Sequence, residues 1–147
     1  MNPSKITMSR MATKEQTLAL LSNYYTCFNA GDTDGMLALM ADDVVHDINQ
    51  GDSEHGIEAF REFFVRMNRC YKENVSDLQL FASDNGTRAA AEFIVHGTYL
   101  STDDGLPKAQ GQTYDLPAGA FFRLHNDRIT RVTMYYNLQH WLNQVHE

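Results

Sequence analysis

Apolar residues recur every three or four positions along the first half of the chain, which is the spacing of an amphipathic helix. Three helices are predicted on this basis, with boundaries set by capping and stop signals. A capping-box pair opens the first helix and a glycine closes it, an aspartate caps the second, and a glycine precedes the third. In chain order they span residues 13–31, 32–43 and 56–71.

The spacing changes to an alternation of two after the second helix and again after the third, which indicates strands. One short strand is expected first, followed by an irregular polar loop. Four further strands, separated mostly by short turns, follow the third helix as antiparallel neighbours, and helical spacing resumes at the end of the chain. The first strand and loop cover residues 44–48 and 49–55, the later strands 78–83, 88–100, 112–125 and 128–137, and the last helix 138–145.

This order of elements defines an α+β domain, in which three helices pack on a strongly curved, mainly antiparallel sheet. Residues 1–12 have no periodic apolar face and are expected to form a flexible N-terminal extension to a single domain over residues 13–147. A curved sheet covered on one face leaves a conical cavity. The 8 Phe, 7 Tyr and 1 Trp of the chain are the residues expected to line it.

Composition argues against several classes of function. The chain has 12 Lys+Arg against 19 Asp+Glu, and a net charge of −7 repels phosphate backbones and anionic membranes. No segment approaches the roughly 20 apolar residues of a membrane span, and no apolar run marks a secretory signal. The cysteines and histidines lack the spacing of metal ligands. We therefore expect a cytoplasmic protein without a metal and without a nucleic-acid or membrane partner.

Three segments, taken with the order of elements, resemble a known family. They are Y-Y-T-C-F-N-A-G-D at 24–32, A-D-D-V at 41–44 and G-I-E-A-F-R-E-F at 56–63. Together they resemble the ketosteroid isomerase-related, SnoaL-like branch of the nuclear-transport-factor-2-like (NTF2-like) superfamily. The resemblance implies an NTF2-like cone with a pocket for a small, apolar, oxygen-bearing ligand, no cofactor, and a homodimer.

The resemblance also implies roles for two residues. In ketosteroid isomerases a tyrosine five residues before the N-A-G-D turn stabilises an oxyanion, and an aspartate on the first strand accepts a proton. The matching positions here are Tyr24 and Asp47. We expect burial to raise the pKa of Asp47 toward the working range of a general base. The second oxyanion donor of that family would fall at Gly119 or Ala120, and neither side chain can donate.

A substitute for the missing donor is sought among Tyr99, Tyr114 and Tyr136. Related polyketide cyclases and epoxide hydrolases carry an aspartate near the position of Asn137, which cannot titrate but could orient a substrate oxygen or a water. Alternation on the strand that begins at residue 88 is expected to direct Gly97 inward, where it leaves room between larger side chains. The predicted substrate-binding wall consists of Phe63, Phe93, Val95, Tyr99, Tyr114, Met134, Tyr136, Asn137 and Trp141.

His46 lies beside Asp47, and adjacent strand residues point to opposite faces, so the two are not expected to cooperate as the pocket His-Asp arrangement of the related scytalone dehydratases does. Two functions remain open. One is cofactor-free proton transfer next to a carbonyl group, in which isomerisation fits the matched residues better than polyketide cyclisation or dehydration. The other is a non-catalytic ligand-binding or assembly module, which the missing second donor favours.

Overall fold

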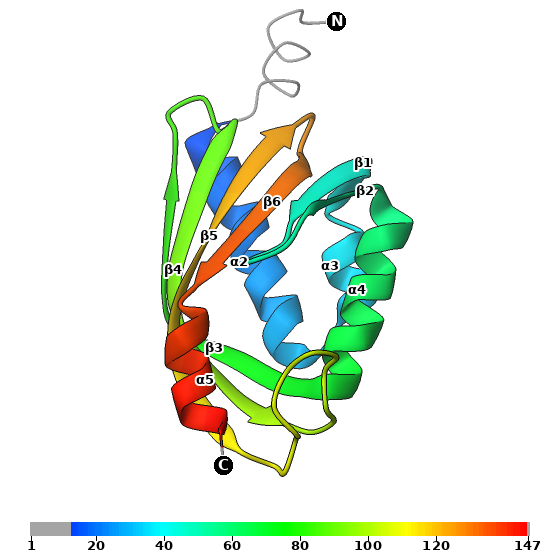
Figure 1. Cartoon of the computed structure of the whole chain (residues 1–147). Coiled ribbons are helices and arrows are strands. Elements are labelled where there is room, and N and C mark those ends of the chain that lie inside the picture. The colour runs from blue at the N-terminus through cyan, green and yellow to red at the C-terminus, as the bar shows by residue number, and fades with distance from the viewer. Residues whose placement is uncertain (1–12, 147) are drawn as a thin grey trace, which may run out of the picture.

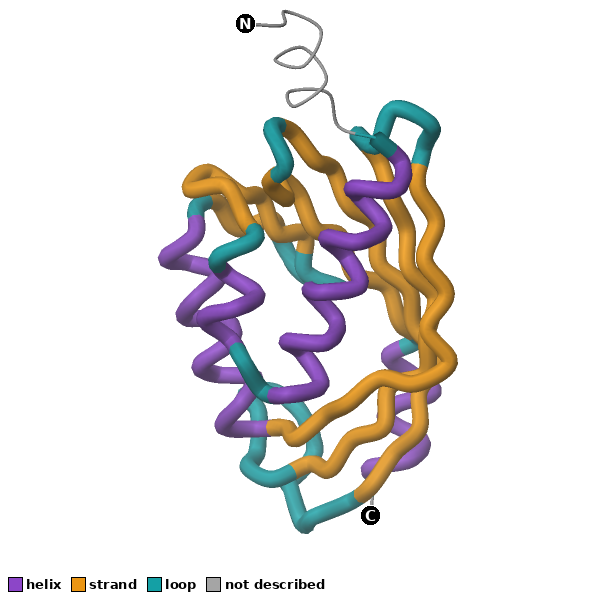
Figure 2. The backbone as a smooth tube through the Cα atoms, turned by 180° about the vertical axis from the view of Figure 1, so that it is seen from behind, coloured by secondary structure: helices purple, strands orange, loops and turns teal. Residues whose placement is uncertain are grey.

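The computed structural model describes residues 13–146, in which helices pack against one face of a curved, open sheet (Figure 1). The sheet order is β2-β1-β6-β5-β4-β3, and β1 and β6 are parallel while all other neighbours are antiparallel. The view from behind shows the same two layers (Figure 2). The elements are α2 (Lys14–Ala30), α3 (Thr33–Leu37), β1 (Met40–Asp47), β2 (Ser53–His55), α4 (Ile57–Cys70), β3 (Tyr71–Ala82), β4 (Arg88–Tyr99), β5 (Thr113–His125), β6 (Arg128–Tyr136) and α5 (Leu138–Val145).

The predicted α+β class and the curved, mainly antiparallel sheet are confirmed. The expected extension over residues 1–12 lies outside the described part of the chain. Helix α2 has the predicted capping box, since the Thr13 hydroxyl accepts from the Gln16 amide at 3.1 Å and the Gln16 side chain accepts from the Thr13 amide at 3.0 Å. It ends at Gly31, whose φ of 70° is left-handed. No helix of residues 13–146 is long and apolar enough to cross a membrane.

The second helix is shorter than predicted, and the first strand longer. Asp32 caps α3 as expected, accepting from the Gly35 amide at 2.9 Å, but the helix ends at Leu37. Strand β1 begins at Met40, which pairs with Ile129 of β6. The apolar spacing of residues 36–40 is helical, but pairing with a strand far along the chain overrides it.

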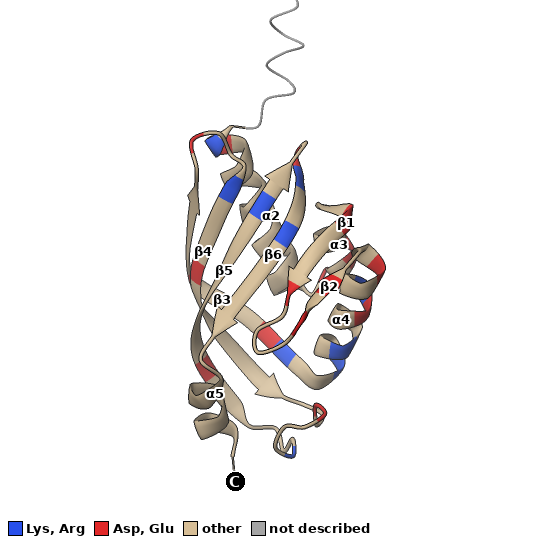
Figure 3. Cartoon of the chain, turned by 45° about the horizontal axis from the view of Figure 1, so that its top comes forward, with Lys and Arg blue, Asp and Glu red and all other residues tan. Residues whose placement is uncertain are grey.

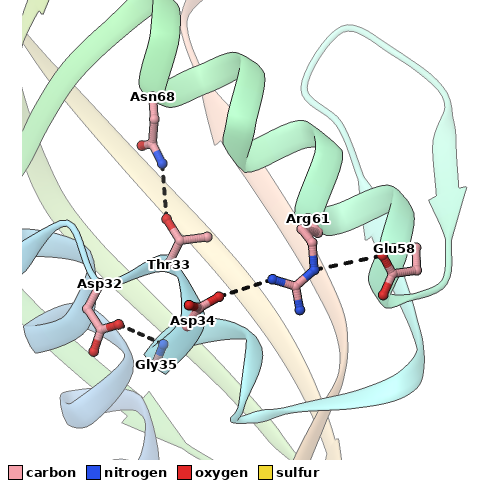
Figure 4. A network of polar contacts seen from close by, with 7 residues as sticks. All are labelled: Asp32, Thr33, Asp34, Gly35, Glu58, Arg61 and Asn68. Atoms are coloured by element: carbon pink, nitrogen blue, oxygen red, sulfur yellow. Dashed lines mark hydrogen bonds and ion pairs between the residues drawn. The ribbon is translucent and has the colours of Figure 1, made fainter.

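Side-chain contacts fasten α3 to α4 (Figure 4). Arg61 of α4 donates to Asp34 at 3.0 Å, and Asn68 of α4 donates to Thr33 at 3.0 Å. These pairs are exposed, and exposed pairs contribute little stability individually. These contacts between α3 and α4 instead help to position α4, whose Phe60 and Phe63 pack against His46 of β1.

Two parts of the sheet were not predicted. The loop expected at 49–55 contains β2, which pairs with β1 over three residues. Strand β3 begins at Tyr71 rather than at residue 78, and Tyr71 therefore does not belong to the third helix. A bulge between Ser76 and Gln79, with Asp77 at a φ of 53°, interrupts the alternation of β3. A bulge shifts the period of two by one residue, which hides the first half of the strand.

Strand β4 alternates as predicted. The predicted inward residues and Ala89, which shares their face, are buried, and the residues of the outward face are not. Gly97 is confirmed as a position of close approach, because a Cβ there would overlap the Tyr114 ring from the next strand. The inward row is Ala91, Phe93, Val95, Gly97 and Tyr99.

Candidate functional site

Asp47 lies in a dense set of hydrogen bonds on the outer side of β1. Its carboxylate accepts from the Arg131 Nε at 2.7 Å and Nη2 at 2.8 Å, from the Thr133 hydroxyl at 2.6 Å and from the Ser53 hydroxyl at 2.5 Å. Burial acts to raise the pKa of Asp47, but the hydrogen bonds from Arg131, Ser53 and Thr133 outweigh it and hold that pKa well below the usual range. The expected rise is therefore wrong, and both oxygens of this carboxylate are already hydrogen-bonded on the outer face of the sheet.

Tyr24 is buried on the helical side of the sheet. Its ring makes edge contacts with Tyr25 at 5.1 Å and Phe122 at 5.7 Å between centroids, and burial raises its pKa. Phe122 pairs with Val132 on the inner face of β5 and β6, whereas Asp47 binds residues on the outer face. The structure therefore does not bring Tyr24 and Asp47 together.

The same alternation that turns Asp47 outward turns His46 inward. His46 is 4% exposed, and its ring stacks on Phe60 at 4.2 Å with 8° between planes and meets the edge of Phe63 at 4.5 Å. Burial lowers its pKa from 6.5 to about 4, although the charge of Asp47 opposes the shift. His46 is thus an uncharged imidazole at neutral pH, enclosed by aromatic rings from α4.

Three side-chain polar atoms of β1, β2 and the loop between them are buried without a hydrogen-bond partner within residues 13–146: His46 Nδ1, Asn49 Nδ2 and Glu54 Oε1. The His46 Nδ1 and Glu54 Oε1 atoms are 3.9 Å apart, which is too far for a hydrogen bond but close enough for an ion pair once the imidazole is protonated. Each unsatisfied buried group costs about 1–3 kcal/mol. The His46 imidazole and the Glu54 carboxylate therefore face each other without a hydrogen bond between them.

The position of Glu54 favours one of the two ring nitrogens as the one that carries the proton of the neutral imidazole. A carboxylate oxygen that faces Nδ1 favours the tautomer with hydrogen on Nδ1, which leaves a lone pair on Nε2. Analysis of the sequence did not select His46, because the family match pointed to its neighbour Asp47. Alternation along the strand could have indicated His46, because it shares one face of β1 with the apolar residue Val44, and both are buried.

The predicted wall tyrosines hold separate polar partners. Tyr99 donates to the Pro107 carbonyl at 2.7 Å and accepts from the Asp103 amide at 3.0 Å, so it fastens the loop that follows β4. Tyr114 donates to Glu73 at 2.5 Å. Burial raises the pKa of Tyr136, and a hydrogen bond with Asn49 opposes the shift.

The other residues predicted to line the pocket lie in three places: beside His46, in a surface groove beside α5, and in the hydrophobic core. Phe63 contacts His46, Met134 is partly buried against the core, and Asn137 is used as the N-cap of α5, accepting from the His140 amide at 3.0 Å. A surface groove of about 590 Å³ between β6 and α5 includes Tyr136 and Asn137 in its lining. Buried positions in the hydrophobic core are held by Phe93, Val95 and Trp141.

Asp47→Asn is expected to lower the free energy of unfolding by about 1.5–3 kcal/mol, because the amide is uncharged and has one acceptor oxygen where Arg131 binds two. Urea denaturation near neutral pH measures the change. Asp43→Asn, at an exposed position of the same strand, is the matched control and should leave stability unchanged. Lost activity with unchanged stability in Asp47→Asn would instead restore this residue as a catalytic group.

The buried neutral His46 makes stability depend on pH. Its pKa is lower in the folded state, so its contribution is complete above about pH 6.5 and is lost as the pH falls toward about 4. The loss should reach about 3 kcal/mol, and His46→Phe, which keeps the stacked ring, should remove that part of the pH dependence. Urea denaturation of both proteins across this range measures it. Parallel pH profiles would contradict the assignment.

The profile of the SnoaL-like domain family matches residues 21–132. A putative polyketide cyclase from Pseudomonas putida is 55% identical, with 86% of this chain and 95% of that chain covered and a TM-score of 0.85. Another from a Silicibacter species is 50% identical, with 92% and 98% covered and a TM-score of 0.89.

An NTF2-like protein from Burkholderia xenovorans has the same fold at 14% identity, with a TM-score of 0.70 over 90% of this chain and 98% of that one. None of the curated proteins matches the chain. The matched profile covers most of the domain, from the middle of α2 to β6. The chain therefore belongs to the SnoaL-like domain family and has the NTF2-like fold.

Proposed function

We propose that this protein catalyses cofactor-free proton transfer next to a carbonyl group of a small, largely apolar compound, with His46 as the proton acceptor. The observation that carries the proposal is the uncharged imidazole of His46, which is 4% exposed, packs against Phe60 and Phe63, and has the partly exposed Glu54 carboxylate 3.9 Å from its Nδ1. A general base must be unprotonated at the working pH. Because burial lowers the pKa of His46 to about 4, its imidazole is unprotonated at neutral pH.

The reaction begins when His46 Nε2 takes a proton from the carbon beside the carbonyl. The electron pair of the broken C–H bond moves onto the carbonyl oxygen and gives an enolate. The imidazolium that forms is stabilised by the Glu54 carboxylate, 3.9 Å from Nδ1. The enolate carbon then attacks the carbon of a second carbonyl group in the same molecule, which closes a ring, and the alkoxide that forms takes the proton back from the imidazolium. In a β,γ-unsaturated ketone the dienolate instead takes the proton back at its γ-carbon, which isomerises the compound.

The relatives support this class of reaction. Three solved structures at 50% identity or more carry the name putative polyketide cyclase, and an aldol ring closure starts from the same proton abstraction as an isomerisation. We therefore take a compound with two carbonyl groups as the substrate class. The sequence alone favoured isomerisation because it placed the base at Asp47.

His46→Asn should slow proton transfer by about 10²–10⁴ while leaving the fold intact. The measurement is the exchange of α-protons for deuterium in a panel of β-diketones and aryl ketones, followed by NMR in D₂O. His125→Asn, at an exposed site of β5, is the matched control and should exchange at the wild-type rate.

Each other outcome of that experiment has a meaning. Exchange that persists in His46→Asn would contradict the role of His46. If the wild type is stabilised by these ketones in thermal shift but exchanges no proton, the protein is the non-catalytic ligand-binding module that the sequence left open.

We propose further that the outer face of the sheet forms a homodimer. Phe121 and Tyr135 lie there in edge contact at 5.8 Å, each more than half exposed. Arg88, Arg123 and Arg131 stand in register on β4, β5 and β6 (Figure 3). Adjacent like charges repel, and within residues 13–146 only Arg131 of the three has an acidic partner. A second copy of this acidic chain supplies complementary charge.

Phe121→Glu should convert the dimer into a monomer, because it places a charge in the centre of the apolar part of the outer face. Size-exclusion chromatography with light scattering measures the mass. Val65→Glu is the matched control, since Val65 is 60% exposed on α4, in the helical layer. A monomeric wild type would contradict the proposal.

A further inference from the structure

A serine, a histidine and an aspartate are joined by hydrogen bonds across the outer face of the sheet. His96 of β4 lies between the other two, with its Nε2 atom 2.6 Å from the Ser76 hydroxyl of β3 and its Nδ1 atom 2.5 Å from the Asp115 carboxylate of β5. An ionised carboxylate only accepts hydrogen bonds, so in the neutral imidazole Nδ1 carries the proton and Nε2 offers a lone pair to the hydroxyl. An imidazole placed in this way can take the proton of a serine hydroxyl.

The register of the sheet brings the three side chains to one face. His96 is the direct partner of Asp115 in the pairing of β4 with β5, and Ser76 is the partner of Ile94, two residues before His96 on the same face of β4. Ser76 and Asp115 are exposed, and His96 is half-buried. A substrate can therefore reach the Ser76 hydroxyl directly from solvent.

The two strands beside β4 are each held at this level by a helix side chain. Asn29 of α2 accepts from the Val75 amide at 2.8 Å and donates to the Val75 carbonyl at 3.1 Å, one residue before Ser76. Gln144 of α5 accepts from the Asp115 amide at 3.0 Å and donates to the Asp115 carbonyl at 2.9 Å. Reacting groups work best when rigid elements position them before the substrate binds, and these four hydrogen bonds fix both outer strands.

Strand β3 has its bulge directly after Ser76. The pairing with β4 stops at Ser76 and resumes at Gln79, and Asp77 has a left-handed φ of 53°. A bulge leaves its extra residue outside the ladder and changes the direction of neighbouring side chains. Ser76 is therefore the last paired residue before the break, and Asp77 and Leu78 beside it have no register partner on β4.

We propose that Ser76, His96 and Asp115 form a second active site, which hydrolyses small uncharged esters through an acyl group carried on Ser76. The apolar residue Ile94 lies next to Ser76 in the register and is itself paired with Pro117 of β5. These two side chains share the outer face with the triad and provide a surface on which a short apolar acyl group can pack. The oxyanion of the tetrahedral intermediate lies beside the bulge of β3.

The reaction needs water as its only co-reactant. Ser76 Oγ attacks the carbonyl carbon of the ester while His96 Nε2 takes the hydroxyl proton. The bond from that carbon to the alcohol oxygen then breaks, and the imidazolium gives its proton to the departing oxygen. Water attacks the acyl-serine in the same way, with His96 passing the proton of the water to Ser76 Oγ, and the carboxylic acid leaves. Asp115 is a positioning residue, because it keeps the proton on Nδ1 and stabilises the imidazolium without touching the substrate.

This second site is independent of the proposed proton transfer. The triad lies on the outer face of the sheet, whereas His46 is buried under the aromatic rings of α4. The triad also lies away from the apolar part of the proposed dimer, because Asp115 is six residues from Phe121 along β5, or about 20 Å. All three groups come from one chain, so a monomer contains the complete site.

The test uses p-nitrophenyl acetate, whose hydrolysis releases a coloured phenolate. Mass spectrometry of the acid-quenched wild type should find the acetyl group on Ser76, because the acyl-serine is an intermediate of the reaction. Ser76→Ala and His96→Asn should each lower the rate of phenolate release by about 10²-fold or more. His125→Asn removes another exposed imidazole from β5, so it is the matched control and should keep the wild-type rate.

Asp115→Asn tests the positioning role with a readout that a merely structural role would not move. The asparagine amide can donate to Nδ1 of His96, which moves the imidazole proton to Nε2 and blocks uptake of the proton from Ser76. Ester hydrolysis should fall about 10-fold or more. The ring-nitrogen shifts of His96 in ¹H–¹⁵N NMR spectra should change from the Nδ1–H form to the Nε2–H form, while circular dichroism shows that the variant is folded.

Three results would overturn the proposal. One is a wild-type protein that releases phenolate no faster than free imidazole at the same concentration, which would make the hydrogen bonds of the triad purely structural. Another is hydrolysis at the wild-type rate in Ser76→Ala. The third is an acetyl group found only on residues other than Ser76.

Discussion

Strand β1 lies between β2 and β6, and its pairing with β6 decides which of its ionisable side chains enters the interior. Asp47 pairs with Thr133 and His46 with Val132 in the parallel register. The hydrogen bonds of Asp47 with Arg131 and Thr133 fix this register from the outer face. A slip of one residue would exchange the two faces and bring a carboxylate inside in place of an imidazole. The outer ion pair of Asp47 and the buried imidazole of His46 are therefore two results of one alignment.

The interior favours uncharged forms of its ionisable groups. Burial lowers the pKa of His46 and raises that of Glu73, and both shifts reduce charge inside the domain. An uncharged imidazole can face an apolar molecule without the cost of a buried ion. In the proposed reaction, charge on His46 appears only during proton transfer, when the Glu54 carboxylate can stabilise the imidazolium.

The helical layer encloses the imidazole of His46 with aromatic rings and adds no ionisable side chain to it. Phe60 and Phe63 of α4 cover the imidazole on its face and edge, and contacts between α3 and α4 hold that helix in place. Phe60 is almost fully buried, and its burial stabilises the fold by about 1.5–3 kcal/mol. Gains of this size offset the unsatisfied polar atoms around His46, which a folded chain without such packing would not tolerate.

The sequence predicted correctly those helices and strands whose capping residues, turns or apolar spacing lie within the element itself. The capping box and the final glycine predicted the bounds of α2. Alternation and turns predicted β4 to β6, and the helical spacing after Asn137 predicted α5. The beginning of β1, the short β2 and the first half of β3 depend on partners elsewhere. Met40 pairs with a residue of β6, and the bulge at Asp77 conceals the alternation of β3.

The sequence by itself determined the family, the α+β class and the fact that His46 and Asp47 must point to opposite faces of one strand. Only the tertiary structure decided which of them lies inside. The deciding partner, Arg131, is 84 residues from Asp47 along the chain, and no local pattern encodes a contact across that separation. The pKa values follow from the same contact, because a carboxylate beside a guanidinium and an imidazole among phenyl rings are shifted by surroundings that exist only after folding.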